Sequence, residues 1–218
     1  MKHLKLSLKQ NLYSHGLKPF KFIAKKGRNF KADKSGVAAI EFALIAPIMI
    51  GMYFGLAEIA SAISIDRRVS HTANVVGDLA TQSTELLNAD VTEVMAAAVR
   101  VLDLPNVSDV TIDITSYDLD TNGDVRDLGR ATLNQGQALQ PFNPDTLDPR
   151  ILNATSGVVV ARIAYSYTPL QLRFTNADID LKETFLLKPR RSSSVPIGDD
   201  PAVQVNCTAT NVANVTCG

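Results

Sequence analysis

Four oxygen-bearing side chains lie close together in the sequence, at Asp118, Asp120, Asn122 and Asp124. Their alternate spacing is that of the oxygen ligands in the first half of a calcium-binding loop. Such a loop needs a bidentate Glu at its twelfth position, and counted from Asp118 that position is Gly129. The same stretch has Asn-Gly between two strand-like runs, which favours a hairpin turn. The sequence leaves both interpretations open, a calcium site and a plain turn.

The two cysteines, Cys207 and Cys217, lie near the C-terminus. In an oxidising compartment, cysteines this close in the chain are expected to form a local disulfide. Their spacing is not that of a Cys-x-x-Cys redox pair, and no histidine lies nearby to complete a zinc site. We therefore predict a structural disulfide, with no metal and no cofactor.

The sequence offers little for catalysis. Of the three histidines, His3 and His15 lie near the N-terminus, and only His71 belongs to the rest of the chain. A Ser/His/Asp arrangement needs a histidine beside its nucleophile, so hydrolase chemistry is not expected. The chain has neither a P-loop nor a Gly-rich dinucleotide-binding string. We predict that the protein is not an enzyme.

Charge is unevenly distributed along the chain. Residues 1–35 carry ten Lys or Arg and one acid, which gives 10 − 1 = +9. Residues 66–218 carry twelve basic and nineteen acidic residues, which gives 12 − 19 = −7. A change of sign across an apolar block is typical of a chain that crosses a membrane. A nucleic-acid-binding protein can also carry a basic arm, but its function would leave the apolar block unexplained.

The apolar block extends from Val37 to Ile65 and is interrupted only by Glu41 and Glu58. A helix of these 29 residues is about 43 Å long, which is enough to cross a hydrocarbon core of about 30 Å. Since basic residues stay on the cytoplasmic side, the leader predicts a cytoplasmic N-terminus and an exported C-terminal part. We thus predict three parts: a cytoplasmic leader (1–36), a transmembrane helix (37–65) and an extracytoplasmic domain (66–218).

Three residues of this block, Pro47, Gly51 and Gly55, are unfavourable in a soluble helix but tolerated in a membrane helix. Glycine there also lets a neighbouring helix approach closely. Two alternatives remain open. The block is a buried core helix of a soluble protein, or it is a secretory signal peptide that is cut after the small-residue sequence ending at Ala62.

Glu41 lies at the start of the uninterrupted apolar run, where a charged side chain is costly without a partner. Around it the sequence from Lys34 to Phe42 reads KSGVAAIEF. This order resembles the processing site of type IV prepilins, which a membrane peptidase cuts after the Gly. The longer string from Gly36 to Pro47, GVAAIEFALIAP, is similar to the N-terminal signature of TadE-like proteins, of the TadE/TadG group, in bacterial Tad/Flp pilus systems.

The resemblance implies a processing site at Gly36, Val37, Glu41 and Phe42. Cleavage after Gly36 leaves 218 − 36 = 182 residues that begin at Val37, with Glu41 fifth. It further implies that Glu41 serves recognition or assembly, for instance by pairing with the new amino group of a neighbouring subunit. The implied role is that of a minor pilin or pseudopilin in an adhesion pilus at the inner membrane. The implied partners are the membrane, other pilins, Tad/Flp assembly proteins and the prepilin peptidase. The alternative is an uncleaved, membrane-anchored periplasmic scaffold or binding module.

The exported part reads as helix followed by strands. Apolar spacing continues the long helix to about Thr84, and Asp90 is expected to cap a second helix through Leu102, with Glu93 completing a capping box. Alternation or β-branched residues predict strands over 110–115, 157–167 and 179–187, with a loop over 134–157. The tail from Ser192 reads as a loop in which Val203 and Val205 extend an edge strand. Together these elements predict a pilin-like α+β fold, in which the long helix packs on a small antiparallel sheet.

Overall fold

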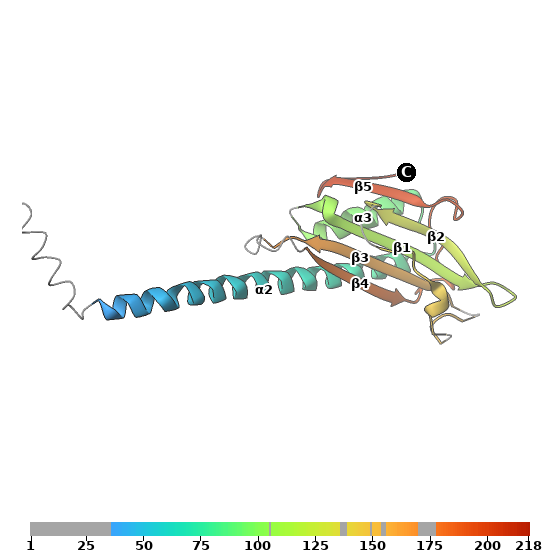
Figure 1. Cartoon of the computed structure of the whole chain (residues 1–218). Coiled ribbons are helices and arrows are strands. Elements are labelled where there is room, and N and C mark those ends of the chain that lie inside the picture. Colours follow the sequence, from blue (N-terminus) through green and yellow to red (C-terminus); the bar gives the residue numbers. More distant parts are fainter. Residues whose placement is uncertain (1–35, 105, 136–138, 149, 154–155, 170–177) are drawn as a thin grey trace, which may run out of the picture. The chain divides into compact units, whose positions relative to one another are not determined.

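A computed structural model of the chain describes residues 36–104, 106–135, 139–148, 150–153, 156–169 and 178–218. The predicted leader therefore lies outside the described residues except for Gly36, as do three short pieces of the predicted loop over 134–157. The chain divides into two compact units, Met1–Tyr53 and Phe54–Gly218. The long helix α2 (Val37–Gln82) begins in the first unit and ends in the second (Figure 1).

In the second unit, α2 packs on the sheet through a stripe of small apolar residues. Val69, Ala73, Val76 and Ala80 are all fully buried, and they recur every three or four residues, as one face of a helix requires. Gly77 lies on the same face, where a Cβ atom would collide with the Leu187 side chain. The glycine thus lets the helix backbone lie directly against the outer strands of the sheet.

The second helix, α3 (Asn88–Leu102), begins before the residue predicted to cap it. Leu87 occupies the N-cap position, and Asp90 lies at the third helical position. From there the Asp90 carboxylate accepts a hydrogen bond from the Leu87 backbone N–H at 3.1 Å, so it satisfies one of the free donors at the helix start. The prediction that Asp90 is the cap with Glu93 as its capping-box partner is wrong by one helical turn.

Six strands form one sheet, in the order β4-β3-β1-β2-β5-β6 (Figure 1). Their bounds are β1 (Val110–Leu119), β2 (Val125–Leu133), β3 (Val158–Tyr167), β4 (Ile179–Leu187), β5 (Val205–Asn211) and β6 (Asn214–Cys217). All neighbouring strands are antiparallel except β2 and β5, which are parallel. The predicted α+β fold is confirmed, with a larger sheet than the sequence indicated.

The sequence indicated a strand-like run after the Asn122-Gly123 turn and an edge strand in the tail, but it gave neither the bounds of β2 nor the β5–β6 hairpin. Arg126, Asp127, Gly129 and Arg130 interrupt the apolar alternation of β2. The hairpin strands are short and alternate polar residues with buried Val205, Cys207 and Ala209, and the disulfide cross-links them. Val205 lies in β5 as expected, whereas Val203 precedes the strand and is exposed.

The central strand β1 is buried on both faces, although its alternation predicts a half-buried strand. Ile112 and Ile114 belong to the core beneath the helices. On the opposite face, Thr111, Asp113 and Thr115 are also buried. A second apolar cluster closes that face, in which Phe142, Leu147, Ile151 and Leu152 from the segment after β2 pack with Tyr117, Leu119, Val158 and Val160.

Candidate functional site

The predicted cleavage point coincides with the first residue of a helix. Gly36 is a turn residue, and α2 begins at Val37. The carbonyl of Gly36 accepts the first helical hydrogen bond, from the Ile40 N–H at 3.2 Å. Gly36 and Val37 are both exposed, and among the described residues no atom lies within 4 Å of a Cβ placed at Gly36. The described part of the chain therefore leaves this bond uncovered.

Glu41 lies one helical turn after Val37, so the two residues share one face of α2. Both Glu41 and the following Phe42 are exposed. The carboxylate therefore lies on the surface of an apolar helix, close to the position that the new amino group of Val37 would occupy after cleavage.

The residues predicted for helix packing lie along one line of α2. Pro47, Gly51 and Gly55 are spaced four residues apart, which places them on one side of the helix. Among the described residues, no atom lies within 4 Å of a Cβ placed at Gly51 or Gly55, so this side has room for a neighbouring helix.

The first half of α2 is apolar and exposed. The helix is long and apolar enough to cross a membrane, and none of its most apolar window is buried within the structure. The exposed large apolar side chains between Val37 and Ala57 are Val37, Ile40, Phe42, Leu44, Ile45, Ile48, Met49, Ile50, Met52, Tyr53, Phe54 and Leu56. Such a surface in water is unfavourable, which is consistent with membrane anchoring.

Residues 36–77 match the family model of TadE-like proteins. No curated protein and no solved structure gives a significant match. The match confirms the resemblance predicted from the sequence, and we call residues 36–77 the TadE-like segment. It begins at the predicted cleavage residue and ends at Gly77, where the helix lies against the sheet.

Outside the TadE-like segment, the turn after β1 forms a hairpin whose acidic side chains are already bonded. The Asp118 carboxylate accepts two hydrogen bonds from the Arg126 guanidinium, at 2.9 and 2.6 Å. The Asp120 carboxylate accepts the backbone N–H groups of Asp124 and Asn122, which lower the pKa of Asp120 below its usual range. Within the described part of the chain, no three His, Cys, Asp or Glu residues gather to hold a metal.

We expect calcium to leave the melting temperature of the protein unchanged, because binding at this turn would have to displace Arg126 from Asp118. Ligand that binds only the folded state raises the melting temperature with concentration, so a thermal melt with and without calcium checks this. Magnesium serves as the control for a nonspecific ionic effect. A rise with calcium alone that Asp120→Ala removes would establish the calcium interpretation.

A disulfide joins Cys207 and Cys217, which lie directly opposite each other on β5 and β6 with their Cα atoms 4.0 Å apart. Cys207 also belongs to the main core. The bond thus cross-links the two strands of the last hairpin, one of whose cysteines packs in the core.

Replacing both cysteines by serine is expected to lower the free energy of unfolding by about 2–3 kcal/mol, because a loop of this length then regains its freedom in the unfolded state. Urea unfolding of the double variant measures the effect. The neighbouring pair Thr208 and Thr216, both exposed and hydrogen-bonded to each other, gives a matched control when changed to valine. Equal effects in the two double variants would contradict a role for the disulfide.

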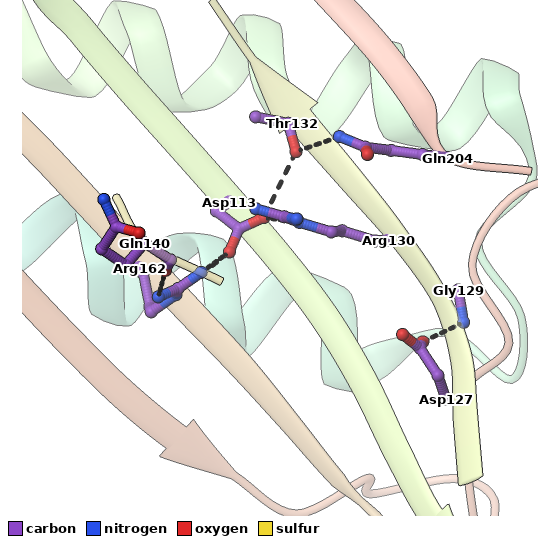
Figure 2. Close-up of polar contacts among 8 residues, drawn as sticks. All are labelled: Asp113, Asp127, Gly129, Arg130, Thr132, Gln140, Arg162 and Gln204. Carbon is purple, nitrogen blue, oxygen red and sulfur yellow. Dashed lines mark hydrogen bonds and ion pairs between the residues drawn. The ribbon is translucent and has the colours of Figure 1, made fainter. Parts of the chain in front are cut away.

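A buried ionic cluster lies on the second face of the sheet, and the sequence analysis missed it (Figure 2). Asp113 is 0% exposed and lies between two arginines. The Arg130 Nε donates to it at 2.5 Å, and the Arg162 Nε donates at 3.0 Å. Thr132 donates to the same carboxylate at 3.2 Å. One signal was visible, since Arg162 is the one charged residue of β3, a strand that is otherwise mostly apolar.

The ionic cluster also fixes the segment that covers this face. The Arg162 Nη1 donates to the Gln140 carbonyl at 2.7 Å (Figure 2). The guanidinium lies 5.6 Å from the centroid of the Phe142 ring, within the range of a cation–π contact. Its partners are backbone and side chains of the same chain, which indicates a structural role.

A second buried acid, Glu58, lies in α2 and accepts a hydrogen bond from the Tyr167 hydroxyl at the end of β3. The sequence could not pair these residues, because they are 109 positions apart. Burial, and next the hydrogen bond to Glu58, raise the pKa of Tyr167 to about 12. The phenol therefore stays protonated and donates throughout the physiological range.

Stability is expected to fall as the pH rises from about 10 towards 12. An unfolded tyrosine loses its proton near pH 10, whereas folded Tyr167 holds it to about pH 12, so the unfolded state is favoured increasingly across this interval. Urea unfolding midpoints measured across the interval test this. Burial also raises the pKa of Tyr117 and Tyr165, so Tyr167→Phe should reduce the decline without abolishing it. An unchanged decline in that variant would contradict the assignment.

Proposed function

We propose that this chain is a minor pilin or pseudopilin-like subunit that takes part in assembling a Tad/Flp-type adhesion pilus. A prepilin peptidase would cut it after Gly36. The observation that carries this proposal is the start of the TadE-like segment at Gly36, where an exposed, apolar helix also begins. The segment continues without a break into a helix that packs on a folded sheet domain.

The proposed location is the bacterial inner membrane, with a cytoplasmic N-terminus and a periplasmic domain. The charge of +9 over residues 1–35 supports a cytoplasmic leader, and the acidic balance beyond residue 65 fits an exported domain. The disulfide of the last hairpin also supports export, since such bonds persist in oxidising compartments.

In this proposal the role is structural and not enzymatic, and it involves neither a cofactor nor a nucleic acid. The helix packs beside those of other pilins, with the open side at Gly51 and Gly55 allowing close contact. The Glu41 carboxylate forms an ion pair with the amino group of a neighbouring subunit, so that two charges neutralise each other within the membrane. The partners are therefore pilins, the assembly proteins and the peptidase.

The intact mass of the protein from its native membrane tests the processing step. We expect a chain of 182 residues that begins at Val37, and a full-length chain in a strain that lacks the peptidase. A chain that begins at Met1 in both strains contradicts a pilin mechanism. A chain that begins at Ile63 indicates signal-peptide cleavage, although Ala62 lies within a continuous helix and packs partly against the core.

The second candidate is an uncleaved, membrane-anchored binding module. One observation favours it, a hollow of about 440 Å³ between the end of α2 and α3. Its lining combines apolar and charged side chains: Leu79, Gln82, Ser83, Leu86, Asp90, Glu93, Val94, Ala97 and Arg191. A full-length chain in both strains, together with loss of pilus assembly on Ala97→Trp, would favour this candidate.

A further inference from the structure

Helix α2 begins to pack on the sheet domain at Glu58, within the stretch that hydropathy assigns to the membrane span. Glu58 is only 6% exposed, and its carboxylate is hydrogen-bonded to Tyr167. Ala62 and Ile65 follow on the same side and pack partly against the core. The contact with the sheet domain therefore begins about three helical turns before Val69, the first fully buried apolar residue.

The helix before Glu58 has the length of a membrane span by itself. From Val37 to Ala57 there are 57 − 36 = 21 residues, and Glu41 is the one charged residue among them. At about 1.5 Å per residue this stretch is about 32 Å long, close to the roughly 30 Å of a hydrocarbon core. Its large apolar side chains are exposed, so lipid has access to them.

Aromatic residues mark the end of this stretch. Tyr53 is 70% exposed and Phe54 is 46% exposed, and both lie in the helical turn before Glu58. Tyrosine is enriched at membrane–water interfaces, because its ring is apolar and its hydroxyl is polar. Exposed side chains here suit the headgroup layer better than the middle of the bilayer.

We infer that the outer membrane–water interface lies at Tyr53–Glu58, so that the lipid headgroup layer is the partner surface at this end of the sheet domain. Tyr167 is the positioning residue that keeps the Glu58 carboxylate turned to the sheet and away from lipid. The span then ends eight residues before Ile65, the end predicted from hydropathy (65 − 57 = 8). This inference rests on the proposed function only in assuming that α2 crosses a membrane.

Glu58 would lie at the edge of the hydrocarbon, where its carboxylate is costly. A charge in that region is unfavourable unless a partner satisfies it. The Tyr167 hydroxyl donates directly to Glu58, and both groups are buried within the sheet-domain unit. The raised pKa of the Tyr167 phenol keeps its donor proton in place at every physiological pH.

Cysteine accessibility in spheroplasts tests the position of the interface. The full-length chain, with its disulfide intact, carries Ser61→Cys, Ser64→Cys or Met52→Cys, all at exposed positions of α2. The probe is a sulfonated maleimide that does not cross membranes. We expect Ser61→Cys and Ser64→Cys to react at least tenfold faster than Met52→Cys, and detergent to remove the difference.

The outcomes separate this inference from the proposed function. Protection of all three positions until detergent is added would move the interface beyond Ile65 and overturn the inference, while a spanning helix and the pilin proposal would stand. Reaction of all three without detergent would mean that α2 does not span a membrane, which overturns both.

The role of Tyr167 is tested by melting temperatures in detergent. Tyr167→Phe should lower the melting temperature by about 3–10 °C, because it removes a hydrogen bond to a buried, charged group. Tyr165→Phe is the matched control, a buried tyrosine of the same strand. Adding Glu58→Gln to Tyr167→Phe should recover part of the loss, because the amide carries no charge. Equal losses in the two tyrosine variants, or no recovery, would overturn the assignment.

Discussion

Asp113→Ala is expected to lower the free energy of unfolding by about 3–5 kcal/mol, a large fraction of the roughly 5–15 kcal/mol typical of a folded domain. The substitution leaves Arg162 buried without its carboxylate, and Arg130 loses the same partner. A buried cation without a counter-ion costs more than the ion pair contributes, since water no longer solvates it. Urea unfolding followed by circular dichroism measures the loss.

Two comparisons isolate the cause of this loss. Asp118→Ala breaks a cross-strand ion pair whose Arg126 side chain is 57% exposed, so it should cost less than about 1 kcal/mol. Replacing Asp113, Arg130 and Arg162 together by apolar residues should restore much of the stability, because no uncompensated charge remains. If Asp113→Ala and Asp118→Ala lower the free energy of unfolding equally, then burial is not the reason for the contribution of the ionic cluster to stability.

The cluster also shows where sequence reasoning about the fold reached its limit. The alternation around Ile112 and Ile114 correctly predicted a strand, because it reports the side-chain period of that strand alone. Whether Asp113 faces water depends on the segment around Phe142, which covers the second face from far along the chain. The residue pattern of one strand does not show whether another segment covers it, so the sequence suggested that Asp113 faces water.

A similar division applies to the candidate site. The start of α2 after Gly36 and its apolar first half follow from local sequence, and the structure places them as expected. The sequence predicted that the apolar block ends at Ile65, because helix propensity and hydropathy continue past Glu58. Its partner Tyr167 lies 109 residues away, so only the folded chain reveals that Glu58 belongs to the sheet domain.

Glu41→Gln is expected to reduce pilus assembly about a hundredfold while leaving cleavage after Gly36 intact. In the proposed mechanism, the carboxylate neutralises the amino group of a neighbouring subunit. Without it, a cation near the membrane remains unpaired, at a cost of about 2.5–3.5 kcal/mol. A cost of that size corresponds to about two factors of ten in an equilibrium. Pili released by shear and quantified by immunoblot measure assembly, and the intact mass of the membrane fraction measures cleavage.

The control for Glu41→Gln is Asp66→Asn, which removes an acid from the same helix beyond the proposed span. It should leave both assembly and cleavage unchanged. If Glu41→Gln assembles as well as the unaltered chain, charge pairing with the amino terminus is not required. If the variant keeps its leader instead, Glu41 acts in recognition by the peptidase, because a subunit with no free Val37 amino group never reaches the pairing step. The two measurements together therefore decide between the two roles that the resemblance implies for this residue.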